Sequence, residues 1–133
     1  MPNHVLINNK IGYFKKKIYV SSDKSLSIRC ILLASQAIGI SKISNLLESE
    51  DVLNALKVIK KLGINYKKNG NKYEINGHGL NGYNLKKNTV INAGNSGTLA
   101  RLILGLLVRT NQKIKHKTQS SGLRKREYSI IVD

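Results

Sequence analysis

The sequence predicts an α/β fold in which two helices pack under a small mixed sheet. Apolar residues recur at helical spacing over residues 25–38 and 49–62, and short strand-like runs alternate with these two stretches. The predicted order is strand, helix, strand, helix, strand, strand, and from residue 89 it begins again with a strand, a tight turn and a helix. At 133 residues, with 41% hydrophobic residues, the chain suits one domain with a modest core.

The first predicted helix follows a strand at residues 15–20 (KKKIYV). It covers residues 25–38, where four apolar side chains recur at helical spacing: Leu26, Cys30, Leu33 and Ala37. Gly39 is expected to end this helix. Cys30 is expected to be a small buried side chain. As the one cysteine of the chain, it can form neither an internal disulfide nor a CxxC zinc site.

The second predicted helix follows a short strand at residues 40–46 and begins near Ser49. The Ser49 hydroxyl is expected to cap the first N–H groups, while Glu50 and Asp51 complement the helix dipole. Gly63 is expected to end the helix. Its apolar face is formed by Val52, Leu53, Leu56 and Ile59.

The remaining predicted elements are short. Residues 64–68 and 72–75 predict two strands joined by the turn NGN at residues 69–71, and residues 89–93 predict a further strand. A helix running to Val108 follows, and after it come a basic strand (KIKHK), a polar turn (TQSSG) and the segment LRKREYSIIVD. Because the last residues form an apolar run without a capping signal, we expect a truncated or split product.

A first candidate anion-binding motif lies at residues 21–29 (SSDKSLSIR), around the predicted start of the first helix. A helix N-terminus offers unpaired N–H groups and the positive end of its dipole to a phosphate or carboxylate. Lys24 adds a mobile charge, and Arg29, one turn beyond the Ser25 hydroxyl, adds a planar fork. The alternative is an ordinary helix, capped by Asp23, whose lysine and arginine are solvated.

A second candidate motif lies at residues 92–101 (NAGNSGTLAR), where a predicted strand turns into a helix. Two glycines flank Asn95 and Ser96 and allow the backbone to approach a ligand closely. Ser96 or Thr98 can cap the helix, and Arg101 lies one turn inside it. The alternative is a purely structural turn, since the spacing matches neither a Walker A loop nor a dinucleotide fingerprint.

The chain is strongly basic, with a formal net charge of +16 from 23 Lys and Arg against 7 Asp and Glu. Such an excess is typical of nucleic-acid binding. The lysines are scattered and rise together with Asn and Ile, so we interpret them as an AT-rich coding bias and expect no specific nucleic-acid target. A cluster at Arg124, Lys125 and Arg126 either binds anions or is solvated. With no long apolar run and no signal-peptide core, we expect no membrane partner and a cytoplasmic location.

Together these motifs resemble the 5-enolpyruvylshikimate-3-phosphate synthase family. DKSLSIRCILLAS is similar to the family's first phosphate-binding helix, NLLESEDVLNALKVIKKLGI to its second helix, and NAGNSGTLARLILGLL to its glycine loop and following helix. The resemblance covers most of residues 21–108. It implies βαβαββ units of the enolpyruvyl transferase fold, one complete and part of a second. Residues 21–133 would then be a partial N-terminal domain, and residues 1–20 a strand segment of the family's second domain.

The resemblance also implies the residues of a binding site. Those that would contact shikimate-3-phosphate are Lys24, Ser25 and Arg29. Those that would contact phosphoenolpyruvate are Lys24, Gly97 and Arg126, supported by a loop that contains Asn95, Thr98 and Arg101. The sequence departs from the family at Glu127, where proline is usual, and at Ser21-Ser22, where Pro-Gly or Pro-Ser is usual.

By this resemblance, the chain would take part in transferring the enolpyruvyl group of phosphoenolpyruvate to the 5-hydroxyl of shikimate-3-phosphate. This transferase step belongs to the shikimate pathway, which leads to chorismate and the aromatic amino acids. No cofactor or metal is implied, and the catalytic acid and base would lie in the second domain. We therefore expect the fragment to be inactive alone, with a separate C-terminal fragment as a candidate partner. Two alternatives stay open: a basic RNA-binding protein, and a non-functional remnant of the enzyme.

Overall fold

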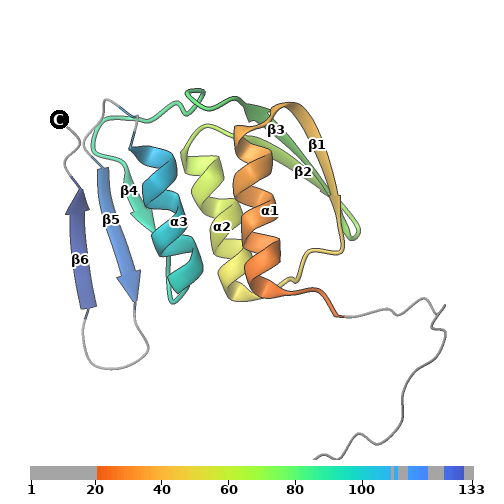
Figure 1. Ribbon diagram of the computed structural model, residues 1–133, viewed down its shortest axis with the longest axis horizontal. Helices are drawn as coiled ribbons and strands as arrows, with labels where there is room; N and C mark the ends of the chain where they lie inside the picture. Colours follow the sequence, from red (N-terminus) through yellow and green to blue (C-terminus); the bar gives the residue numbers. More distant parts are fainter. Residues whose placement is uncertain (1–20, 109, 111–113, 120–124, 131–133) are drawn as a thin grey trace, which may run out of the picture.

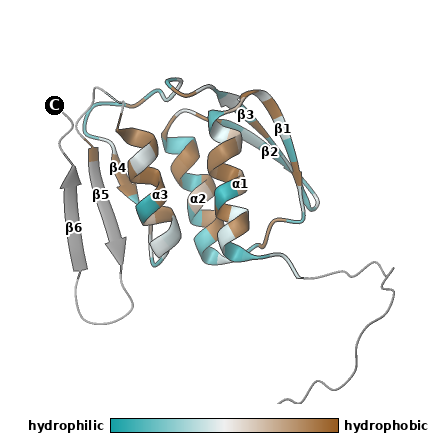
Figure 2. Cartoon of the chain, in the orientation of Figure 1, coloured by the Kyte–Doolittle hydropathy of each residue, from teal (hydrophilic) through white to brown (hydrophobic). Residues whose placement is uncertain are grey.

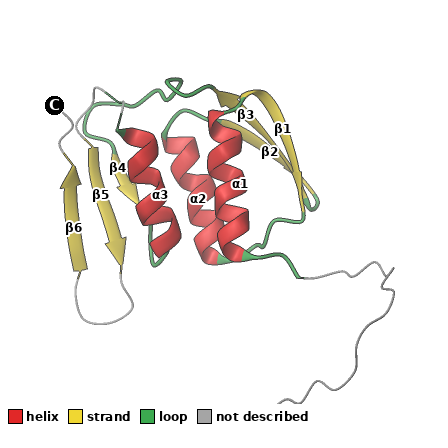
Figure 3. Ribbon diagram, viewed as in Figure 1, coloured by secondary structure: helices red, strands yellow, loops and turns green. Residues whose placement is uncertain are grey.

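The computed structural model describes residues 21–108, 110, 114–119 and 125–130, so the predictions for residues 1–20 lie outside the described residues. The helices are α1 (Lys24–Gln36), α2 (Glu50–Lys61) and α3 (Gly97–Leu107). The strands are β1 (Ile38–Ser44), β2 (Asn65–Asn69), β3 (Lys72–His78), β4 (Val90–Asn92), β5 (Ile114–Gln119) and β6 (Lys125–Ile130). In the described part of the chain, the three helices lie between two three-stranded sheets (Figures 1 and 3).

The first sheet is antiparallel, with the strand order β1-β3-β2. Strands β2 and β3 form a hairpin whose turn contains Gly70 at a φ of +58°, which confirms the turn predicted there. Along β3, buried and exposed residues alternate, and Tyr73, Ile75 and Gly77 are the buried ones. A Cβ at Gly77 would overlap the carbonyl oxygens of the last turn of α1, so the strand can pass there only as glycine.

The second sheet has the order β4-β5-β6, with β4 parallel to β5 and β5 antiparallel to β6. Two sheets therefore stand where the sequence predicts one small mixed sheet, and only the second of them is mixed. The reason is the connection over residues 79–89, which leads from β3 along the ends of the helices to their other side before β4 begins (Figure 1). Strand β4 can then pair with β5 and not with the first sheet.

The core lies between the helices and the sheets and draws on all three helices. Hydrophobic residues are distributed along each helix in Figure 2. The fully buried apolar side chains include Ile28 and Ile31 of α1, Ala55 and Ile59 of α2, Leu99 and Ile103 of α3, Ile75 of β3 and Ile91 of β4. This shared core fixes the three helices relative to one another.

The predicted buried face of α1 is wrong. Leu26 and Leu33 are 58% and 67% exposed, and Cys30, predicted to be buried, is exposed. The buried side chains of α1 are instead Ser27, Ile28, Ile31, Leu32, Ala34 and Ser35. Apolar residues occur on every side of this helix, so their spacing alone does not select a face, and packing against α2 and β3 decides it.

Of the two glycines predicted to end helices, one does so and the other does not. Gly63 follows α2 with a φ of +87°, as predicted. Gly39, however, does not end α1, which stops at Gln36, because Gly39 lies within β1 opposite Gly77. The predicted apolar face of α2 is confirmed at its buried positions Val52, Leu56 and Ile59, while Leu53 is 41% exposed.

Candidate functional site

Helix α1 begins inside the first candidate motif. Asp23 is its N-cap, with its Oδ1 accepting a hydrogen bond from Leu26 N at 2.7 Å, as expected. Ser27 is buried, and its Oγ donates to the Asp23 carbonyl oxygen at 2.6 Å and accepts from Leu47 N at 3.0 Å. These bonds are structural, and they leave Lys24 and Ser25 in the first turn for contacts outside the helix.

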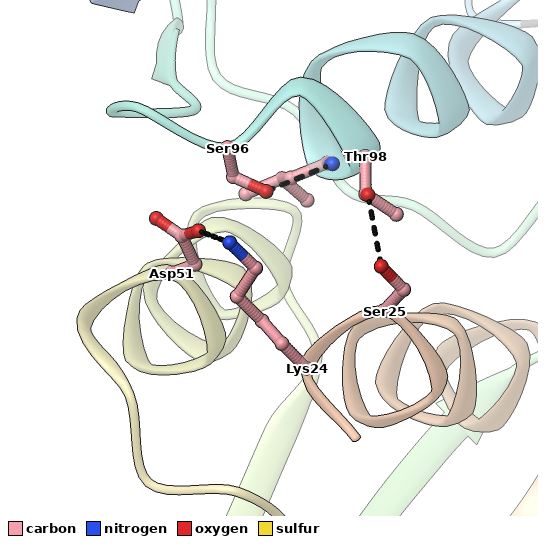
Figure 4. A network of polar contacts seen from close by, with 6 residues as sticks. Lys24, Ser25, Asp51, Ser96 and Thr98 are labelled. Carbon is pink, nitrogen blue, oxygen red and sulfur yellow. Dashed lines mark hydrogen bonds and ion pairs between the residues drawn. The ribbon is translucent and has the colours of Figure 1, made fainter. Parts of the chain in front are cut away.

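Lys24 forms an ion pair with the first turn of α2. Its Nζ lies 2.8 Å from Oδ2 of Asp51, and the two side chains are 50% and 15% exposed (Figure 4). The hydrogen bond to Asp51, followed by the negative charge of that carboxylate, raises the pKa of Lys24 above its ordinary value. Lys24 is therefore held as a cation beside the start of α2.

Ser25 connects α1 to the second candidate motif. Its Oγ lies 3.3 Å from Oγ1 of Thr98 at the start of α3 (Figure 4). Of the two residues expected to cap α3, Ser96 does so, since its Oγ accepts a hydrogen bond from Leu99 N at 3.1 Å. Thr98 is thus left to face Ser25, and the two candidate motifs meet in the structure.

The glycine loop before α3 lies against α2. Gly94 has a φ of +58° and donates its N–H to Oδ1 of Asn92 at 2.8 Å. A Cβ at Gly94 would overlap Nδ2 of Asn54, which projects from α2. Asn95 and Gly97 are exposed on this loop. The absent side chain at Gly94 therefore lets the loop backbone approach α2 closely.

All three helices start at the same end of the molecule. In Figure 1 they run side by side with their first turns at the lower end, and the Lys24–Asp51 and Ser25–Thr98 contacts connect these turns. Each first turn presents N–H groups and the positive end of a helix dipole. Together with Lys24 and the hydroxyls, this end of the bundle has the chemistry to attract phosphate or carboxylate groups.

The three candidate arginines lie outside the first turns of the helices. Arg29 is exposed one turn into α1 and lines an apolar groove between α1 and α3 together with Leu32, Leu33, Gln36, Leu102 and Leu106. Arg101 is exposed one turn into α3, with its Nη2 4.0 Å from where a Cβ of Gly97 would lie. Arg126 pairs with Thr118 in the register of β5 and β6, at the end of the second sheet where β4 leads into the glycine loop.

Sequence reasoning missed two residues at this site and misjudged a third. The sequence predicts Asp51 as a complement to the helix dipole and not as the partner of Lys24, and no sequence pattern points to Asn54. Ser49 occupies the N-cap position of α2 but makes no capping bond, and its buried Oγ has no hydrogen-bond partner within the described residues. The acidic first turn of α2 is the sequence signal that could have identified Asp51 as a partner for the lysine of the first motif.

Two structural features are absent from the described ranges. None of their helices combines the length and the apolar character needed to cross a bilayer. The same ranges bring together no group of three or more His, Cys, Asp or Glu side chains able to hold a metal ion.

Comparison with known proteins places these features in a family. The sequence model of EPSP synthase (3-phosphoshikimate 1-carboxyvinyltransferase) matches residues 8–118. The chain belongs to the EPSP synthase family. It is 39% identical over 128 residues to the 3-phosphoshikimate 1-carboxyvinyltransferase of Alkaliphilus metalliredigens, with 96% of this chain covered. It is 49% identical over 89 residues to that of Ruthia magnifica, with 66% of this chain covered.

Solved structures agree with the sequence comparison. The EPSP synthase from Acinetobacter baumannii superposes on 82% of this chain with a TM-score of 0.64 and 31% sequence identity. This match confirms the predicted enolpyruvyl transferase fold. The chain spans 24% of that structure, and 29% and 20% of the Alkaliphilus and Ruthia relatives, so it corresponds to a limited part of each of these EPSP synthases.

Proposed function

We propose that this chain supplies part of the active site for enolpyruvyl transfer from phosphoenolpyruvate to the 5-hydroxyl of shikimate-3-phosphate. The observation that carries the proposal is the meeting of Lys24, Ser25 and Thr98 at the shared N-terminal end of three helices. Both substrates carry a phosphate and a carboxylate, the groups that such an end attracts. Family membership adds the substrate class, since the relatives are named 3-phosphoshikimate 1-carboxyvinyltransferases.

Within this proposal, each substrate has its own set of binding residues, and Lys24 belongs to both sets. The residues assigned to shikimate-3-phosphate are Lys24, Ser25 and Arg29. The residues assigned to phosphoenolpyruvate are Lys24, Gly97 and Arg126, and the surrounding loop is shaped by Asn95, Thr98 and Arg101. The family resemblance assigns Lys24 to both sets, and the place of its ammonium group near both Ser25 and Ser96 of the loop before α3 supports this assignment (Figure 4).

The reaction would use these groups for attraction and orientation. The 5-hydroxyl gives up its proton to a base as its oxygen bonds to C2 of phosphoenolpyruvate and a proton is added at C3. The resulting tetrahedral intermediate then loses a proton from C3 while the bond between C2 and the phosphate oxygen breaks and phosphate leaves. Holding the two anions in reacting geometry accounts for much of such a rate. Asp23 caps α1 and Asp51 pairs with Lys24, so both are already engaged. Following the family resemblance, we assign the general acid and base to another part of the enzyme, carried by the same or a separate polypeptide.

The central test of this proposal is the substitution Lys24→Met, which removes the charge and keeps most of the aliphatic stem. Shikimate-3-phosphate is titrated into the folded chain and followed through backbone amide chemical shifts. We expect the dissociation constant to rise about fivefold or more, the scale of losing one exposed charge contact. Lys57→Met, at an exposed lysine of α2, is the matched control and should bind like the parent chain.

Three outcomes would count against the proposal. Equal binding by the parent chain and Lys24→Met would show that Lys24 does not form the anion site. A parent chain that binds neither substrate would favour a non-functional remnant. A chain that ignores shikimate-3-phosphate but binds RNA with a steep salt dependence would favour the RNA-binding alternative. Phosphate release from phosphoenolpyruvate is measured in parallel, with and without a C-terminal fragment of a related EPSP synthase, and we expect turnover only with the fragment.

A further inference from the structure

The N-terminal half of α2 contacts both candidate anion-binding motifs. Asp51 holds the ammonium of Lys24 at 2.8 Å, and the Nδ2 of Asn54 lies so close to Gly94 that a Cβ at this position would displace it. Asp51 and Asn54 are three residues apart on one helix and therefore share a face. One rigid helical turn thus separates the group that contacts Lys24 from the group that contacts the glycine loop.

The start of α2 is itself held in place from several directions. Glu48, just before the helix, accepts a hydrogen bond from the hydroxyl of Tyr73 at 2.8 Å and pairs with Lys68 at 2.7 Å. Tyr73 is 2% exposed, so this anchor rises from the core of the first sheet. The backbone N–H of Leu47 is bound by Ser27 of α1. The position of Asp51 relative to α1 and β3 is therefore set by contacts outside its own helix.

We propose that Asp51 and Asn54 are positioning residues that fix the separation between Lys24 and the Gly94–Gly97 loop, and that Asp51 acts on ligand binding through Lys24. The proposal rests on the proposed function, because it takes Lys24 and the loop as the groups that meet the substrates. None of the implied substrate contacts involves α2. In this proposal, α2 keeps Lys24 and the glycine loop one helical turn apart.

The geometry favours positioning over blocking by Asp51. An ammonium group has three N–H donors, and Asp51 occupies one of them. The side chain of Lys24 remains 50% exposed, so its other donors can reach a ligand while the ion pair persists. A flexible lysine loses rotamer freedom when it binds a ligand, and a partner that already orients it reduces this loss.

The experiment is a double-mutant cycle on shikimate-3-phosphate binding, measured by amide chemical shifts of the 133-residue chain. Asp51→Ala should weaken binding about fivefold, the scale of an exposed charge contact. Asp51→Asn should retain most of the affinity, because its amide oxygen still accepts from Lys24. In a Lys24→Met background, Asp51→Ala should have no further effect, since a residue that acts through Lys24 has nothing left to position.

Two further readouts separate positioning from a general effect on folding. The pKa of Lys24, followed by NMR of its side chain, should fall in Asp51→Asn and Asp51→Ala and stay at the parent value in Asn54→Ala. Asn54→Ala should weaken phosphoenolpyruvate binding about threefold or more, by releasing the loop. If Asp51→Ala does not fold, the affinity and the Lys24 pKa of Asp51→Asn decide the question.

Each result bears on one proposal. Tighter binding by both Asp51 variants would show that the carboxylate blocks the site, and additive effects of Lys24→Met and Asp51→Ala would show that Asp51 acts independently. Either result would overturn the positioning role while leaving the proposed function intact. If Lys24→Met itself binds like the parent chain, the proposed function fails first and the positioning role fails with it.

Discussion

Helices α1 and α3 begin with side-chain caps, whereas α2 begins without one. Asp23 and Ser96 each accept a hydrogen bond from the backbone N–H three residues later. Ser49 holds the equivalent position of α2, but its hydroxyl makes no such bond. The start of α2 is fixed instead by Glu48, which reaches Lys68 and Tyr73 of the first sheet.

The starts of α1 and α3 are thus fixed by local contacts, whereas the start of α2 is fixed by tertiary contacts. A side-chain cap depends only on residues within one turn of the helix start, so it can form wherever the helix lies in the fold. The start of α2 is fixed by contacts with β2, β3 and α1, so its position depends on the surrounding fold. This arrangement suits a helix that has to hold a fixed place between the two candidate motifs.

The largest effect is expected at the loop that leads into α3. Gly94→Ala must adopt a φ of +58° and displace Asn54, so we expect a loss of about 2 kcal/mol or more of unfolding free energy, measured by urea denaturation. Gly105→Ala is the matched control inside α3, where no atom lies within 4 Å of the added Cβ. It should stabilise the chain by about 0.5–1 kcal/mol. Equal effects of the two substitutions would contradict the role given to Gly94.

The next largest effect tests the caps directly. Asp23→Ala and Ser96→Ala should each lower the unfolding free energy by about 1 kcal/mol, because each removes an acceptor for an otherwise unpaired N–H group. Ser49→Ala should change it by less than about 0.5 kcal/mol, because no capping bond is lost. The same urea titrations provide the three values. A loss at Ser49 as large as at Ser96 would remove the distinction between the helices.

The smallest effect concerns the pH dependence of the α2 anchor. The hydrogen bond from Lys68, followed by that from Tyr73, holds the pKa of Glu48 below its usual value of 4.5. A folded-state pKa below the unfolded one adds stability above the unfolded pKa, and this contribution is lost as the pH falls through the folded value. The urea concentration at the unfolding midpoint should therefore decrease as the pH is lowered below about 5. This decrease should be smaller in Glu48→Gln than in the parent chain, and intermediate in Tyr73→Phe. Identical pH profiles for Glu48→Gln and the parent chain would exclude Glu48 as the source.

The parts of the fold that depend on neighbouring residues were predictable. The caps Asp23 and Ser96, the turn at Gly70 and the buried face of α2 follow from residues within one or two turns. The face of α1 was not predictable from spacing, because that helix is apolar on every side and only its neighbours select Ile28 and Ile31 for burial.

The candidate site also contains features that were predictable from the sequence and one that was not. The motifs that contain Lys24, Ser25 and Thr98 were predicted from their anion-binding and capping chemistry, and the family resemblance then assigned these residues to a substrate site. The structure brings the three together. The pairing of Lys24 with Asp51 was not predicted, because it depends on how two helices are placed by the core and not on either sequence motif. The assignment of substrates to individual residues remains a prediction that the binding experiments test.

From the side-by-side, same-direction arrangement of the three helices, we expect folding to be sensitive to dissolved anions. Parallel helix dipoles repel one another, and their positive ends add together at the turns joined by Lys24–Asp51 and Ser25–Thr98. An anion that binds there relieves this repulsion in the folded state and finds no equivalent in the unfolded chain. By mass action, the fraction of folded molecules then depends on the anion composition of the surrounding solution.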